Sequence, residues 1–355
     1  MANADTPEAA RKAREYGAMG IGLCRTERMF NASDRLPIVI DMILANNREE
    51  RQTALDRLLP IQRKDFIDLF TVMAPDPVTV RLLDPPMHEF LPTEHQLIDE
   101  IRMLRVYRDV VRGRQTALAS IDNVPPLPEA FTELSEEHVM DALAKKERML
   151  SKVRELQETN PMLGHRGVRL GITYPEIYSM QLQAILEAAA HCAKEGIDAQ
   201  PEIMVPQVIT SQELGHVKRT VAELKTKLES EKSVELDFRF GTMVETVRAC
   251  TRARQLAEDA EFFSFGTNDL TQAVFSFSRE DAENKFLPMY NDYGILQDNP
   301  FEVLDIQGVG QLIEMTVQNG RAVRNNLKIG ICGEQGGHPE TIRFCHHVGL
   351  NYVSC

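Results

Sequence analysis

Short apolar runs that end in small, polar or charged residues recur along this chain. The run at 262–267 reads FFSFGT, and Asn268 and Asp269 follow it directly. Similar runs lie at 20–25, 78–83, 237–245 and 328–332. Because a strand inside a parallel sheet is buried on both faces, it reads as a short apolar run rather than as an alternating pattern. These runs therefore predict parallel strands with reactive side chains at their carboxyl ends.

Segments with helical spacing separate the runs. The pattern predicts helices over 6–16, over the long region 37–73 and over 175–196. Asp5 is the predicted N-cap of the first helix. Further strands are predicted at 202–208 and 351–354, and an eighth at 1–4. Eight strands alternating with helices, with chemistry at the strand ends, predict an α/β fold of the (β/α)₈ barrel type.

One large insertion interrupts this alternation, from about residue 87 to about residue 171. Prolines punctuate it at Pro125, Pro126 and Pro128, and a strongly charged helix is predicted from about 135 to 158. We interpret it as a lid or subdomain on the barrel, so that 1–355 forms a single domain. The barrel is expected to be truncated at both ends, because the sequence starts and stops in or beside strands. Apolar strand surface left uncovered there would favour self-association.

The composition is that of an ordinary globular chain and disfavours several classes of function. Hydrophobic residues make up 43% and charged residues 26%. No window approaches 18 uninterrupted apolar residues, so no membrane span is expected, and the N-terminus lacks the apolar core of a secretory signal. The net charge of -13 disfavours nucleic acid as a partner. The six cysteines lack metal-finger spacing and predict reduced thiols.

Two carboxylates end neighbouring predicted strands. Glu245 ends the run at 237–245, and Asp269 follows the next one. Carboxylate oxygens together with substrate oxygens and water are the ligands that Mg²⁺ prefers. The sequence therefore predicts a Mg²⁺ site. The structural alternative is that the two residues cap the helices that follow.

Two arginines end the early strands, and a third lies in a nearby loop. Arg25 and Arg81 close the runs at 20–25 and 78–83, and Arg166 lies in the segment NPMLGHRG. The guanidinium fork binds phosphate or carboxylate bidentately. The three residues suggest a dianionic substrate, although strand-end arginines can also form structural ion pairs.

Two small turns complete the candidate site. Cys332 stands beside the glycine-rich turn CGEQGG and is either a buried apolar side chain or a proton donor. Gly266, Thr267 and Asn268 offer a backbone amide, a hydroxyl and a side-chain amide to a small oxyanion. Their alternative is a tight turn before a helix.

A series of motifs carries a family resemblance over nearly the whole chain. In order, they are GIGLCRTERMF, RLLDPPMHEFLP, NPMLGHRGVRLG, PEIMVP, FGTMVE, FFSFGTNDLTQ and GICGEQGG. The chain resembles the phosphoenolpyruvate/pyruvate-binding barrel of the pyruvate, phosphate dikinases. Phosphoenolpyruvate synthase and enzyme I of the bacterial sugar phosphotransferase system belong to the same wider family. The segment RLLDPPMHEFLP is most similar to the dikinases.

The resemblance implies a role for each candidate residue. Arg25 and Arg81 match substrate-binding arginines, and Arg166 matches an arginine near the site. Glu245 and Asp269 match Mg²⁺ ligands that also face the substrate. The implied substrate loop is Gly266, Thr267 and Asn268, and the implied proton donor to the enolate carbon is Cys332. The implied reaction interconverts phosphoenolpyruvate and pyruvate by phosphoryl transfer with a phosphohistidine on another domain.

The resemblance also implies partners and a location. The phosphohistidine motif and the nucleotide-binding domain of the family are absent from this sequence, so the chain alone is expected to be inactive in the reaction with ATP and phosphate. Its expected partners are the phosphohistidine domain of the full-length enzyme and a second copy in a homodimer. The expected location is the cytoplasm or an organelle such as a plastid or glycosome.

Three departures from the family pattern and three alternative functions stay open. Thr246 and Val247 stand where the family usually has Ile-Pro, Arg28 where a histidine is common and Gln207 where a leucine is common. The alternatives are a phosphoenolpyruvate synthase or enzyme I type of domain, a Mg²⁺-dependent lyase acting through a pyruvate enolate, and a module that binds without catalysis.

Overall fold

The computed structural model describes residues 1–120 and 136–355. Its described part contains one eight-stranded sheet in which every neighbouring pair is parallel and the order follows the chain from β1 to β8. The strands are β1 (Ala2–Asn3), β2 (Ile21–Arg25), β3 (Pro77–Arg81), β4 (Gln200–Val205), β5 (Arg239–Val244), β6 (Phe262–Phe265), β7 (Lys328–Ile331) and β8 (Tyr352–Val353).

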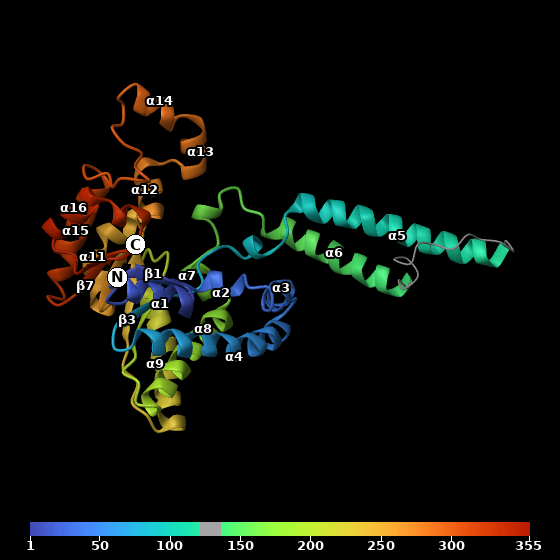
Figure 1. Ribbon diagram of the computed structural model, residues 1–355, viewed down its shortest axis with the longest axis horizontal. Helices are drawn as coiled ribbons and strands as arrows, with labels where there is room; N and C mark the ends of the chain where they lie inside the picture. The colour runs from blue at the N-terminus through green and yellow to red at the C-terminus, as the bar shows by residue number, and fades with distance from the viewer. Residues whose placement is uncertain (121–135) are drawn as a thin grey trace.

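The first and last strands meet and bring the sheet round into a barrel. The backbone amide of Asn3 donates to the carbonyl of Cys355 at 3.0 Å, and the ammonium group of Met1 donates to the carbonyl of Val353 at 2.9 Å. The two ends of the chain accordingly lie side by side (Figure 1). The (β/α)₈ prediction is confirmed, including the short eighth strand at residues 1–4.

Helices cover the outside of the barrel and bury the apolar strand faces against a continuous core. Adjacent helices in this layer pack on one another, as α4 does on α8 and α11 on α15. The outer helices are α1 (Pro7–Glu15), α3 (Leu36–Leu44), α4 (Arg48–Met73), α8 (Pro175–Lys194), α9 (Ser211–Lys232), α10 (Val247–Thr251), α11 (Ala253–Asp259), α15 (Val309–Arg321) and α16 (Pro339–His347).

The helical region predicted at 37–73 is confirmed and consists of two helices, because the Asn47 side chain accepts from the amide of Glu50 at 2.9 Å and starts α4 anew. The predicted N-cap of the first helix is wrong. The N-cap of α1 is Thr6, whose hydroxyl accepts from the amide of Ala9. Asp5 instead accepts from the backbone amide of Arg25 at 2.6 Å, so it fixes the end of β2 rather than the helix.

The insertion after β3 is mainly a helical hairpin. Figure 1 shows α5 (Glu94–Ser120) and α6 (Glu136–Leu156) extending together from the barrel. At its base α6 contacts α3 and the short helix η1 (Met87–Phe90). The chain then returns to the barrel through η3 (Pro161–Leu163) and α7 (Val168–Thr173). Two features of the sequence analysis lie outside the described residues: the prolines at 125, 126 and 128, and the predicted start of the charged helix at 135.

A second excursion, which the sequence pattern did not predict, lies between β6 and β7. After α12 (Thr267–Phe275) the chain forms α13 (Arg279–Lys285) and α14 (Leu287–Asp292), which stand clear of the barrel in Figure 1. Phe277, Phe286 and Phe301 give this arm a small apolar core of its own. Among the described helices, none combines the length and apolar content that crossing a membrane requires.

Candidate functional site

A cavity of about 780 Å³ lies at the carboxyl ends of the barrel strands. Side chains from the loop before α7 and from the start of α13 form part of its wall. All nine residues singled out from the sequence line it: Arg25, Arg81, Arg166, Glu245, Gly266, Thr267, Asn268, Asp269 and Cys332. The structure therefore gathers residues from opposite ends of the chain at one place, while their individual roles stay predictions.

Arg81 is the most constrained cation of the site. It is paired in register with Arg25 across β2 and β3, and it is almost fully buried. Its Nη1 lies 3.0 Å from Oδ2 of Asp84, and its Nη2 donates to Glu27. Burial opposes the charge, but Glu27 and Asp84 outweigh it and raise the pKa of Arg81. A fixed positive charge therefore faces the cavity.

Arg166 lies between two carboxylates. Its Nε donates to Oδ1 of Asp84 at 3.2 Å, and its Nη1 donates to Oδ1 of Asp269 at 3.1 Å. Burial alone would raise the pKa of Asp84, but Arg81 and Arg166 lower it. The backbone beside Arg166 is fixed as well, since the amide of Gly167 donates to the carbonyl of Asp84 at 2.8 Å.

Glu245 directly follows β5, and only 1% of it is exposed. Its Oε1 accepts from the backbone amide of Gln207 at 2.7 Å, and its Oε2 has no hydrogen-bond partner among the described residues. Burial, with the negative charge of Asp269 beside it, raises the pKa of Glu245 well above its usual range. The capping alternative is wrong for both carboxylates, because Thr246 and Gly266 are the N-caps of α10 and α12.

These groups suit a hard divalent cation. The side-chain oxygen of Asn268 is buried and lacks a partner in the described structure, as does Oε2 of Glu245, and both residues line the cavity with Asp269. The described residues contain no cluster of three or more His, Cys, Asp or Glu side chains with metal-ligand geometry. A cation held here would therefore rely on two carboxylates, with substrate oxygens and water completing its shell, as Mg²⁺ commonly does.

The position of Cys332 is compatible with both interpretations of its sequence, the buried apolar side chain and the proton donor. It packs in an apolar cluster inside the barrel with Leu23, Met204, Met243 and Phe262, yet it also lines the cavity. Its Sγ lies 3.5 Å from the carbonyl oxygen of Phe265. Burial raises the pKa of this thiol to about 11, so the group carries a proton at neutral pH.

Gln335 connects the two turns of the site. Its Oε1 accepts from the hydroxyl of Thr267, and its Nε2 donates to the carbonyl of Pro300 at 2.8 Å and to Thr271 at 3.3 Å. The close approach of the turns requires glycine at 333. A Cβ added there would lie 1.7 Å from the Thr267 hydroxyl.

Oxalate is a planar dianion that mimics the pyruvate enolate expected from the family resemblance, and it serves as a probe of this site. Gly333→Ala is expected to weaken oxalate binding by at least about tenfold, because Thr267 must then rotate and break its buried hydrogen bond to Gln335. The variant needs no unusual backbone conformation, since φ at Gly333 is -74°. Titration calorimetry with oxalate and Mg²⁺ checks this. Gly337→Ala is the matched control, because its added Cβ would meet only Cys355 at 3.7 Å. Equal affinities in the two variants would contradict the prediction.

The sequence reasoning missed four residues that hold the site together: Glu27, Asp84, Gln207 and Gln335. A carboxylate three positions after a strand-end arginine was the available signal for Asp84. Gln207 adopts a positive φ of 60°, which is uncommon for a residue other than glycine. That conformation directs the backbone amide of Gln207 at the Glu245 carboxylate, and only the folded structure reveals this contact.

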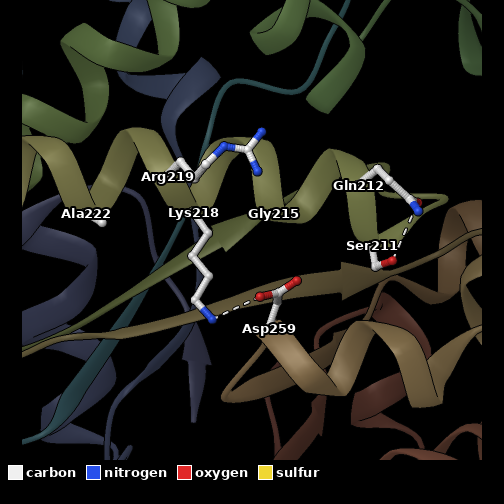
Figure 2. A pocket seen from close by; sticks show the side chains of 7 residues that line it. All are labelled: Ser211, Gln212, Gly215, Lys218, Arg219, Ala222 and Asp259. Carbon is white, nitrogen blue, oxygen red and sulfur yellow. Dashed lines mark hydrogen bonds and ion pairs between the residues drawn. The ribbon is translucent and has the colours of Figure 1, made fainter.

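A second hollow, of about 530 Å³, lies on the outer surface between α9 and α11. In Figure 2 the Lys218 side chain crosses it to Asp259, with Nζ 3.1 Å from Oδ1, while Arg219 is directed away. None of the nine candidate residues and none of the strand ends borders this hollow. The cavity at the carboxyl ends is therefore the candidate functional site.

Comparison with known proteins places the chain in a family. The family model described as "PEP-utilising enzyme, PEP-binding domain" matches residues 1–355. The whole chain is 51% identical to a pyruvate, phosphate dikinase of Entamoeba histolytica, covering 37% of that protein. It is also 49% identical to the chloroplastic pyruvate, phosphate dikinase 1 of Arabidopsis thaliana, covering 33% of it. A pyruvate, phosphate dikinase of Rhizobium meliloti is 46% identical over 99% of the chain and 35% of its own length.

The chain thus spans about a third of the length of the curated relatives it matches. The match extends over the full barrel, and it includes the strand ends that form the cavity. On this evidence the chain belongs to the family of PEP-utilising enzymes and corresponds to their PEP-binding domain.

Proposed function

We propose that this chain carries out the phosphoenolpyruvate/pyruvate half-reaction of a pyruvate, phosphate dikinase. In that half-reaction a phosphoryl group passes between phosphoenolpyruvate and a phosphohistidine on another domain. The observation that supports it most is the convergence of two register-paired arginines, the buried carboxylate of Glu245, the partly buried carboxylate of Asp269 and a protonated thiol on one cavity. The likeness to dikinases favours this assignment over a phosphoenolpyruvate synthase or enzyme I.

The arginines bind the anionic ends of the substrate in this proposal. Arg25 and Arg81 enter the cavity from neighbouring strand ends, and a guanidinium fork matches both carboxylate and phosphate oxygens. Glu27 and Asp84 keep Arg81 charged and oriented before the substrate arrives. Such a fixed charge loses little energy to reorganisation when charge moves during the reaction.

Glu245 and Asp269 hold Mg²⁺ in this proposal, with the side-chain oxygen of Asn268 nearby. When bound, the ion supplies positive charge that stabilises an oxyanion on the substrate. Two ligands from a rigid barrel suffice, because Mg²⁺ retains water and takes substrate oxygens.

Cys332 acts as the acid. The bond between phosphorus and the C2 oxygen of phosphoenolpyruvate breaks as a bond to the histidine nitrogen forms, which leaves the enolate of pyruvate. The Cys332 thiol then gives its proton to C3, the enolate oxygen becomes the ketone, and a thiolate remains. In the reverse direction the thiolate takes a methyl proton from pyruvate.

In this proposal the phosphohistidine comes from another part of the full-length enzyme. The likeness to dikinases that are about three times as long as this chain supports that part of the proposal. The complete reaction would then be ATP + pyruvate + phosphate giving AMP + phosphoenolpyruvate + diphosphate. A homodimer and a site of action in the cytoplasm or in an organelle such as a plastid belong to the same proposal. The chloroplastic and bacterial relatives support that range of locations.

Exchange of the pyruvate methyl protons tests this proposal in a reaction that needs no phosphohistidine. The chain is incubated with pyruvate and Mg²⁺ in D₂O and followed by proton NMR. We expect deuterium to enter the methyl group only when both Mg²⁺ and the chain are present. If the chain binds oxalate but catalyses no exchange, it is a binding module rather than a catalytic half-site.

A further inference from the structure

The proposed function does not use one contact of the site, the ion pair between Arg166 and the proposed metal ligand Asp269. Its Nη1 donates to Oδ1 of Asp269 at 3.1 Å. We propose that Arg166 is an internal counter-ion, which neutralises Asp269 until a divalent cation takes its place and is then free to bind the substrate anion. This inference rests on the proposed function, because it assumes that Asp269 receives the cation.

The two carboxylates of the site differ in how they are compensated. Oδ1 of Asp269 receives the guanidinium of Arg166, whereas Oε2 of Glu245 has no partner in the described structure. An ion held by both carboxylates therefore meets the positive charge of Arg166 at Asp269, whereas Oε2 of Glu245 carries no such contact. A divalent cation on Asp269 and the guanidinium of Arg166 on the same carboxylate repel each other, so cation binding and this contact oppose each other.

Arg166 can give up Asp269 and stay in place. Its Nε and Nη2 both bind Asp84, which is 1% exposed and is also held by Arg81. The backbone is anchored by the Gly167 amide on the carbonyl of Asp84, and by Val168 on Pro206. Only Nη1 faces Asp269, and its other close contact is the sulfur of Met162 at 3.6 Å. Release therefore frees one end of the guanidinium towards the cavity.

The arrangement makes cation and anion binding cooperative. Without the cation, an anion would have to compete with Asp269 for Nη1 of Arg166. Once the cation is bound, that nitrogen is available, so each ligand raises the affinity for the other by the same factor. Arg166 then supports the anion and opposes the cation, and its removal should change the two affinities in opposite directions.

Manganese binding provides the test, with Mn²⁺ as the paramagnetic probe and the chain of 355 residues at pH 8. Free Mn²⁺ is counted by electron paramagnetic resonance, and oxalate affinity is measured calorimetrically at saturating Mn²⁺. In Arg166→Gln we expect Mn²⁺ alone to bind roughly fivefold more tightly, and oxalate to bind at least roughly tenfold more weakly. Arg28→Gln is the matched control, because it removes an arginine from the same cavity wall without touching Asp269. It should change the Mn²⁺ affinity by less than about twofold.

Weaker or unchanged Mn²⁺ binding in Arg166→Gln, in a variant folded by circular dichroism, overturns the inference. Failure of the unmodified chain to bind Mn²⁺ and oxalate together would instead overturn the proposed function. If Arg166→Gln does not fold, Arg166→Lys serves, since an ammonium cannot hold Asp84 with two nitrogens and also reach Asp269. We then expect a smaller rise in Mn²⁺ affinity, and a fall would count against the counter-ion.

Discussion

Replacing Asp269 by asparagine is expected to abolish Mg²⁺-dependent oxalate binding. The substitution keeps the shape of the side chain but removes one of the two charges available to the cation. Replacing a residue that only hydrogen-bonds to a metal ligand already lowers metal affinity by about 10- to 100-fold, so replacing a ligand itself should lower it by more. The loss is measured as the ratio of oxalate dissociation constants in Mg²⁺.

The control for Asp269→Asn is Asp281→Asn. Asp281 also lines the cavity, but it is exposed on α13 and pairs with Lys285. Exposed ion pairs contribute little free energy, so the oxalate affinity of Asp281→Asn should change by less than about threefold. Equal losses in the two variants would show that general negative charge, and not a ligand at Asp269, governs binding.

Replacing Cys332 by alanine is expected to lower the rate of pyruvate methyl exchange by on the order of 10²- to 10⁴-fold, while oxalate affinity changes little. The thiol is buried on the cavity wall and is the proton carrier in the proposed reaction, whereas oxalate has no carbon that accepts a proton. Cys345→Ala, which removes a buried thiol from α16 outside the cavity, should exchange at the unmodified rate. A similar loss in both variants would contradict the assignment.

The pH dependence of pyruvate methyl exchange is a second test of the role proposed for Cys332. In the proposed reaction the base that takes the methyl proton is the thiolate of Cys332, and burial raises the pKa of this thiol to about 11. Below that pKa the thiolate fraction grows with pH, so the exchange rate should rise about tenfold per unit between pH 7 and pH 9. A rate that is flat over this range would point to a different base.

Much of this architecture could be predicted because buried parallel strands leave a plain signal in the sequence. Each of the apolar runs proved to be a strand, and each candidate residue lies at or just beyond a carboxyl end, or in the loop holding Arg166. Strand-end chemistry follows from the barrel geometry itself. That is why residues as distant in sequence as Arg25 and Cys332 could be assigned to one site.

The supporting contacts could not be predicted, because they depend on which loops meet. Asp5 was misassigned as a helix cap since its partner, the amide of Arg25, belongs to another element. Gln335 looked like a turn residue until its side chain was seen to reach Thr267 and Pro300. The α13–α14 arm was missed for a similar reason, because its small aromatic core forms only after the chain folds back on itself.

Calorimetric titration of the chain with oxalate, with and without Mg²⁺, tests the central claim most directly. Oxalate is a planar dianion that mimics the enolate of pyruvate, and in the proposed site its binding requires the arginines, the carboxylates and the Thr267 turn together. The account predicts binding that depends on Mg²⁺. A chain that is folded by circular dichroism but shows no Mg²⁺-dependent oxalate binding would contradict it.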